Sequence, residues 1–174
     1  MTFAASSKRT GSGDVMSTVK PLYAAAAAFG TWSLASLTTG QGRRGPSVDN
    51  SSNLYMDALV TLGVLIGTFT APASFVVFTY ASADDGSNFM TGGSTDAAYN
   101  TIRNDELGPV MTVAAYTNTT TFWGVGTIAW AYRGGFAPRN WGGIFSQTNC
   151  GTLSSTESNH IKKFQGVQFS ILGS

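Results

Sequence analysis

The chain has 174 residues, a net charge of +1 and 11% charged residues, against about 25% in an average soluble domain. One Cys and one His exclude an internal disulfide and leave few groups for acid–base or nucleophilic chemistry, so we do not expect an enzyme. The length suits one domain whose core folds without disulfides or metals. The low charge favours a subunit covered by other protein, and a secreted Ser/Thr-rich monomer is the alternative.

Residues 1–20 are rich in Ser, Gly, Ala and Thr and are expected to form an extended N-terminal arm. Such a segment cannot bury enough surface to offset its own ordering entropy. We therefore expect a partner surface to hold the arm, and the alternative is that the arm folds back along its own domain. We expect no signal peptide, because Gly, Ser and Asp stand where an apolar run is needed.

Residues 21–174 are expected to form a single β domain. Polar and apolar residues alternate at residues 31–37 and again at 54–66, where Leu54 and Met56 belong to the predicted core face. The β-branched and aromatic run at residues 74–82 predicts a third strand. Between the first two, the Gly-rich residues 40–46 are expected to form a loop.

The second half of the chain also consists of short apolar runs separated by turn-forming residues. Turn-forming residues at 84–88 and a long polar connection at 90–108 precede further apolar runs. Strands are predicted at residues 110–116, 122–131, 141–148 and 161–172. About eight short strands separated by turns indicate an all-β fold, an antiparallel β-sandwich of jelly-roll type.

Candidate chemistry is sparse. Cys150, Glu157 and His160 could supply three zinc ligands, but their spacing fits no usual motif, so a His at a strand edge is the preferred interpretation. The acidic loop at residues 84–88 could bind calcium, although a plain hairpin turn is preferred. We therefore expect no cofactor and no metal. The interrupted apolar stretches predict no membrane span, and the scattered basic residues predict no nucleic-acid binding.

The aromatic residues allow two interpretations. The four Trp and six Tyr could form a platform on which sugars stack, or they could belong to the core and to a subunit interface, which is the more usual place for aromatics on strands. These residues are Trp32, Trp123, Trp130, Trp141, Tyr23, Tyr55, Tyr80, Tyr99, Tyr116 and Tyr132.

Three segments carry a resemblance to a known class of protein. They are VDNSSNLYMDALV at residues 48–60, FTYASADDGSNF at residues 78–89 and PRNWGGIF at residues 138–145. Their order resembles small virion structural proteins of tailed bacteriophages, which have a β-sandwich of jelly-roll type. The resemblance implies a non-enzymatic capsid decoration (cement) protein in the virion, assembled in the host cytoplasm and often trimeric. The major capsid protein or another virion protein is then the expected partner.

Candidate partner-binding residues are basic side chains of the first 50 residues and two Trp. They are Lys8, Arg9, Lys20, Arg43, Arg44, Trp130 and Trp141. Two alternatives stay open. One is a neck, tail or baseplate component of the particle, and the other is a carbohydrate- or receptor-binding β-sandwich module.

Overall fold

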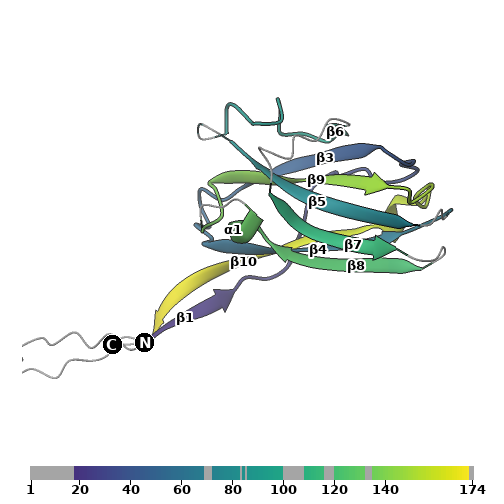
Figure 1. The fold of residues 1–174 in the computed structure, drawn as a ribbon. Coiled ribbons are helices and arrows are strands. Elements are labelled where there is room, and N and C mark those ends of the chain that lie inside the picture. The colour runs from purple at the N-terminus through teal and green to yellow at the C-terminus, as the bar shows by residue number, and fades with distance from the viewer. Residues whose placement is uncertain are drawn as a thin grey trace, which may run out of the picture.

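The computed structural model describes residues 18–68, 72–82, 84, 86–99, 108–115, 120–131 and 135–172. These residues form two antiparallel β-sheets that lie face to face (Figure 1). Lys8 and Arg9 of the predicted arm lie outside the described residues. The last residues of that arm, from Thr18 onward, belong to the first strand.

The first sheet has the order β1-β10-β4-β8, and the two-residue strand β2 also pairs with β10. Its strands are β1 (Thr18–Tyr23), β2 (Ala27–Ala28), β4 (Asp57–Leu65), β8 (Thr121–Thr127) and β10 (Ile161–Leu172).

The second sheet has the order β6-β3-β9-β5-β7. Its strands are β3 (Gly42–Asp49), β5 (Ala73–Ala81), β6 (Ala97–Ala98), β7 (Pro109–Ala115) and β9 (Asn140–Thr148). Two short helices complete the described elements, α1 (Ile128–Ala131) and η1 (Glu157–Asn159).

The strand order is that of a jelly roll. Without the two-residue strands β2 and β6, eight strands remain, four in each sheet. They pair as the arms of one long folded hairpin, with β5 against β7 next to the bend, then β4 against β8, β3 against β9 and β1 against β10. Wrapping such a hairpin into two sheets gives the eight-stranded jelly roll. The predicted fold class is therefore confirmed.

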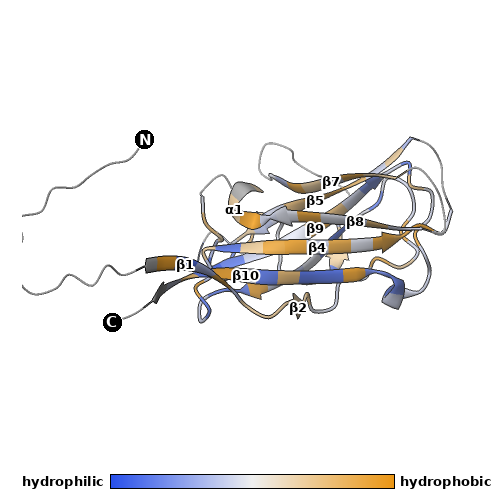
Figure 2. Ribbon diagram, turned by 90° about the horizontal axis from the view of Figure 1, so that it is seen from below, coloured by the Kyte–Doolittle hydropathy of each residue, from blue (hydrophilic) through white to orange (hydrophobic). Residues whose placement is uncertain are grey.

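The core lies between the two sheets and follows the alternation of their strands. On β4, Ala58, Val60 and Leu62 are buried, and on β5, Phe75 and Val77 face them across the sandwich. Successive side chains of a strand point to opposite faces of the sheet. The inner face of each sheet is therefore apolar, and the outer face does not contribute to this core. Figure 2 shows the apolar segments of β4 between the more mixed β8 and β10.

Residues 31–37 form no strand, contrary to the prediction. Their alternation has another cause, because Trp32 and Leu34 insert into the core from a loop. The backbone N–H groups of Leu34 and Ala35 donate to the carboxylate of Glu157 at 2.9 and 2.7 Å instead of to a neighbouring strand. A side chain thus provides the hydrogen bonds that a sheet would otherwise supply.

The predicted loop at residues 40–46 is also wrong, because strand β3 begins at Gly42. Its glycines are needed for close packing. A Cβ at Gly45 would lie 2.6 Å from the ring of Trp32, and one at Gly42 would lie 2.1 Å from the carbonyl oxygen of Tyr99. The pairing with β9 shifts register between Arg44 and Ser47, at the position of the proline.

Two strand predictions need smaller corrections. The predicted strand at residues 122–131 ends at Thr127 and continues as helix α1. The predicted strand at residues 54–66 begins only at Asp57, and both Leu54 and Met56, expected in the core, are exposed. Leu54 has a positive φ of 52°, which belongs to a turn rather than to a strand.

Candidate partner-binding face

The outer face of the first sheet carries exposed aromatic and aliphatic side chains. Because Leu62 of β4 points into the core, its neighbours Thr61 and Gly63 point outward. Val125 of β8 lies directly opposite Thr61, and Trp123 lies opposite Gly63. Trp123 is 54% exposed and Val125 is 63% exposed, so both stand on the surface. A Cβ at Gly63 would lie 2.8 Å from the Trp123 ring, and the indole therefore rests on the glycine.

The same face continues along β10 onto β1. Val167 of β10 pairs with Asp57 of β4 and, on its other side, with Tyr23 of β1. Pro21 lies opposite Phe169, and residues directly opposite one another share a face. Phe169 is 60% exposed. This outer face of the first sheet is called the open face below. Its exposed large apolar side chains are Val19, Tyr23, Trp123, Val125 and Phe169.

These five are half of the ten exposed large apolar side chains among the described residues. They form two groups, one on β8 and one on β1 and the end of β10, and exposed Lys163 lies on the same face between them. Exposed apolar patches mark interaction sites. Part of the open face extends past the sandwich, because β1 and the last residues of β10 form a two-stranded ribbon that projects from one end (Figure 1).

The opposite sheet is arranged differently. The described residues 86–99, between β5 and β7, lie over the outer face of the second sheet and are called the crossing segment below, and β6 of this segment pairs with β3. Phe89 and Tyr99 from the crossing segment pack on Tyr80 and Ile144, which are fully buried. Within the described part of the chain, segments of the protein itself thus pack on one outer face, and none packs on the other.

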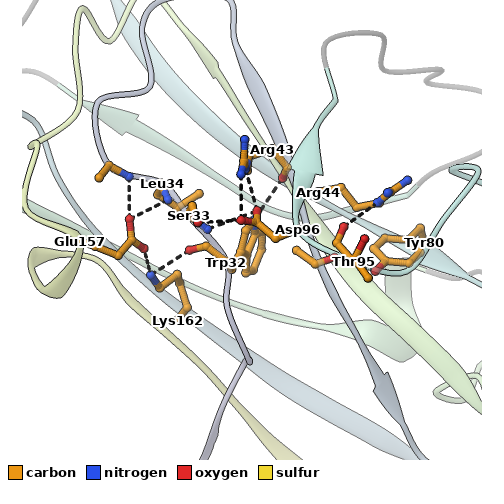
Figure 3. A network of polar contacts seen from close by, with 12 residues as sticks. Trp32, Ser33, Leu34, Arg43, Arg44, Tyr80, Thr95, Asp96, Glu157 and Lys162 are labelled. Carbon is orange, nitrogen blue, oxygen red and sulfur yellow. Dashed lines mark hydrogen bonds and ion pairs between the residues drawn. The ribbon is translucent and has the colours of Figure 1, made fainter.

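The predicted basic residues are not gathered into one site. Arg43 donates two hydrogen bonds to the carboxylate of Asp96, at 2.6 and 2.8 Å (Figure 3). Arg44 is buried and donates to the carbonyl oxygens of Thr91 and Thr95. Both arginines therefore fasten the crossing segment to β3, and a partner-binding role for the buried Arg44 is wrong. Among the described basic candidates, Lys20 on β1 is the one whose side chain is exposed.

The ion pair also fixes the protonation states of its members. The hydrogen bond to Asp96 raises the pKa of Arg43, although partial burial opposes it. Burial acts to raise the pKa of Asp96, but hydrogen bonds from Arg43 and Ser33 outweigh it and lower that pKa. Since the Ser33 hydroxyl donates to the same carboxylate at 2.6 Å, Asp96 joins the Trp32 loop, β3 and the crossing segment.

The two predicted Trp residues have different positions. Trp141 is fully buried, packed edge-on against Phe29 and Phe164, so it cannot touch a partner and the prediction for it is wrong. Trp130 lies in α1, and its side chain is outside the described part. Sequence reasoning named Trp123 only as one of four. Trp123 is distinguished from the other three by its position opposite Gly63 in the paired strand, where its ring lies on the surface. The sequence alone does not show which residues are paired.

A shallow hollow of about 540 Å³ lies beside the Trp32 loop, lined by Phe29, Glu157, His160 and Lys162 among others. Two of its charged groups, Glu157 and Lys162, are paired with each other. Glu157 forms an ion pair with Lys162 and accepts the two backbone N–H groups described above, and the Lys162 ammonium also donates to the carbonyl oxygen of Trp32 (Figure 3). This arrangement holds the Trp32 loop against η1 and β10.

Among the described residues, which do not include Asp85 of the acidic loop, no three His, Cys, Asp or Glu lie close enough to hold a metal ion. Burial raises the pKa of Cys150, whose thiol donates to the carbonyl oxygen of Ser74. Asp84 accepts hydrogen bonds from Asn88, chiefly from its side chain, which lower the pKa of that carboxyl and close a turn. A protonated thiol and a self-bonded turn are structural features.

Comparison with models of known protein families and with curated protein sequences gives no match. Among the described residues, no helix is long and apolar enough to cross a membrane. The topology defines the class of protein as an eight-stranded jelly-roll β-sandwich, in which the described residues cover one outer face and leave the other open.

Proposed function

We propose that this chain is a non-enzymatic structural protein of a bacteriophage particle that binds the capsid exterior as a decoration subunit. The observation that carries the proposal is the open face, with its five exposed large apolar side chains on one sheet. The sequence resemblance given by residues 48–60, 78–89 and 138–145 supports a role in a phage particle. The open face supports a lasting contact with another protein.

The mechanism is adhesion. A standard interface of about 1,600 Å², at roughly 25 cal/mol per Å² of its apolar part, favours binding by roughly 20 kcal/mol before association and ordering costs are subtracted. Only the surplus appears as affinity, but repetition over many copies of a shell multiplies it. A low content of charged residues, 11%, suits a surface that meets protein rather than a charged ligand.

A carbohydrate- or receptor-binding module is the second candidate, and one observation favours it. The Trp123 indole lies along the sheet with 54% of its surface exposed, which is how a sugar-stacking platform is built. Trp32 and Trp141 are buried and cannot belong to such a platform. Glycan binding that is lost in Trp123→Ala would favour this candidate over adhesion to a shell.

The test is the copy number of this chain in purified virus particles, measured by quantitative mass spectrometry. Hundreds of copies are expected for a decoration protein of the head. A number between about six and twelve would move the chain to the neck, tail or baseplate, and its absence from particles would reject the proposal. Light scattering on the purified chain would check the expected homo-oligomer, for which a trimer is favoured.

A variant pair locates the binding surface. Val125→Lys places a charge on the open face, while Met90→Lys places the same charge on an exposed apolar residue of the covering segment. Binding to heads that lack this protein should fall at least tenfold for the first variant and stay within twofold for the second. Equal loss in both would contradict the assignment of the open face.

A further inference from the structure

The projecting ribbon has a free strand edge in the described part of the chain. Val167 is the last residue of β10 that pairs with β4, and the five residues after it pair only with β1. On its other side, β1 pairs with no described strand. Edge strands offer unpaired N–H and C=O groups to an incoming chain.

The direction of these groups follows from one hydrogen bond. The N–H of Ala24 donates to the carbonyl oxygen of Gly166 at 2.9 Å, so the main-chain groups of even-numbered residues face β10. Those of Val19, Pro21 and Tyr23 therefore point away from the sheet. Pro21 has no N–H to lose and is placed where a proline is tolerated, on the outward side of an edge strand.

The side chains of the ribbon add a chemical preference. Val19, Pro21 and Tyr23 belong to the apolar open face, together with Phe169 of β10. Lys20 is the one charged residue of β1 and points to the opposite face. A strand added beside β1 would extend the apolar face with its own apolar side chains, and would place its intervening side chains next to Lys20.

Building on the proposed function, we propose that the outer edge of β1 binds an extended segment of the shell subunit as an additional strand of the first sheet. The segment is apolar at alternate positions and carries a carboxylate that pairs with Lys20. The bonds it makes are to the N–H and C=O of Val19, the C=O of Pro21, and the N–H and C=O of Tyr23. Strand addition of this kind takes its affinity from main-chain hydrogen bonds and its specificity from alternate side chains.

A second copy of this chain fits the edge poorly. Antiparallel self-pairing centred on Pro21 brings two carbonyl groups together with no N–H between them, and pairing centred on Lys20 places two like charges opposite each other. Pairing centred on Leu22 sets Val19 opposite residue 25, which lies beyond the end of β1. Each of these three registers therefore loses bonds that a foreign strand can make or sets like charges opposite each other.

Residue-resolved hydrogen exchange tests the inference, read by NMR after release of the protein from shells. The amides of Val19 and Tyr23 should exchange quickly in the free chain and at least a hundredfold more slowly on the shell, while Lys20 and Leu22 are protected in both. Protection of Val19 and Tyr23 in the free chain would overturn the inference, because a second copy or the chain's own first residues would then occupy the edge. Shell binding without new protection would overturn it while the proposed function stands. No binding to shells would reject both.

A substitution at one site separates the main chain from the side chain. Tyr23→Pro removes one outward N–H and leaves the bonds to β10 intact, whereas Tyr23→Val removes the aromatic ring and keeps the N–H. We expect at least tenfold weaker shell binding for Tyr23→Pro and less than threefold for Tyr23→Val, at equal melting temperatures. Equal loss in the two variants would assign the effect to the side chain and overturn the strand-addition mode. Lys20→Glu should also weaken binding about tenfold.

Discussion

The indole of Trp123 rests on Gly63 across the β4–β8 pair, at a distance that leaves no room for a Cβ on the glycine. The contact is on the surface, so the ring can swing away into solvent. Gly63→Ala should therefore cost less than about 1 kcal/mol of stability, but it should change the fluorescence of Trp123 and weaken partner binding. Denaturant unfolding and a fluorescence spectrum of the variant check this.

Gly126, on the same strand β8, gives the opposite expectation. A Cβ there would lie 1.9 Å from the carbonyl oxygen of Val110, a main-chain atom of β7 that cannot move by itself. Gly126→Ala should therefore destabilise the fold by about 3 kcal/mol or prevent expression. Similar unfolding midpoints for Gly63→Ala and Gly126→Ala would contradict the packing described for the two faces.

Trp141 in the core and Trp123 on the surface allow a second comparison between two variants. Trp141 is fully buried between Phe29 and Phe164, and Trp141→Ala should cost about 3–5 kcal/mol of unfolding free energy. Trp123→Ala should cost less than about 1 kcal/mol and act on binding instead. Thermal unfolding of both variants tests the assignment, and a larger loss for Trp123→Ala would reverse it.

The strands that the sequence predicts well are those with one buried face. β4 and β5 alternate because their inward side chains fill the sandwich, and the pattern predicts them to within a few residues. The alternation of Trp32 and Leu34 has the same origin but no strand, because Glu157, more than 120 residues away, supplies the hydrogen bonds. A contact between residues so distant in sequence cannot be predicted from the local pattern of residues 31–37.

Strand β3 and the open face were harder to predict for a related reason. Gly42 and Gly45 indicate a loop by any local rule, yet they are glycines because Tyr99 and Trp32 press against them. Arg44 reads as a surface cation, but the carbonyls of the crossing segment bury it. Which of two apolar surfaces is covered depends on how that crossing segment packs, and the composition of the strands carries no information about it.

Asp96 should make the free energy of unfolding depend on pH in the acidic range. Its pKa is lowered in the folded protein, so its contribution is complete above the unfolded value of about 3.9 and is lost as the pH falls below that value. Asp96→Asn breaks the pair with Arg43 and should cost about 1–3 kcal/mol at pH 7, with a weaker acid dependence. Urea unfolding between pH 3 and 7 measures both effects. Asp49→Asn, at a fully exposed carboxylate, is the control and should change stability less.

His160 gives a second pH dependence that can be assigned without ambiguity, because it is the only His of the chain. It is buried, its Nε2 lies 3.1 Å from the carbonyl oxygen of Ser154, and its Nδ1 has no partner among the described residues. Nε2 therefore carries the proton of the neutral ring and donates it to Ser154, and a second proton on Nδ1 would have no acceptor there. Burial lowers the pKa of His160, although Ser154 and Glu157 act in the opposite direction.

The sign of the effect follows from that shift. The unfolded chain binds a proton on His160 near pH 6.5, while the folded chain resists it, so unfolding takes up a proton as the pH falls. The stability that comes from the neutral ring is complete above about pH 6.5 and is lost as the pH falls toward the lower folded pKa. His160→Gln keeps an amide donor near the position of Nε2 and cannot titrate. Its urea midpoint should change less between pH 7.5 and 5.5 than that of the natural chain, and an equal change in the two proteins would show that another group titrates in this range.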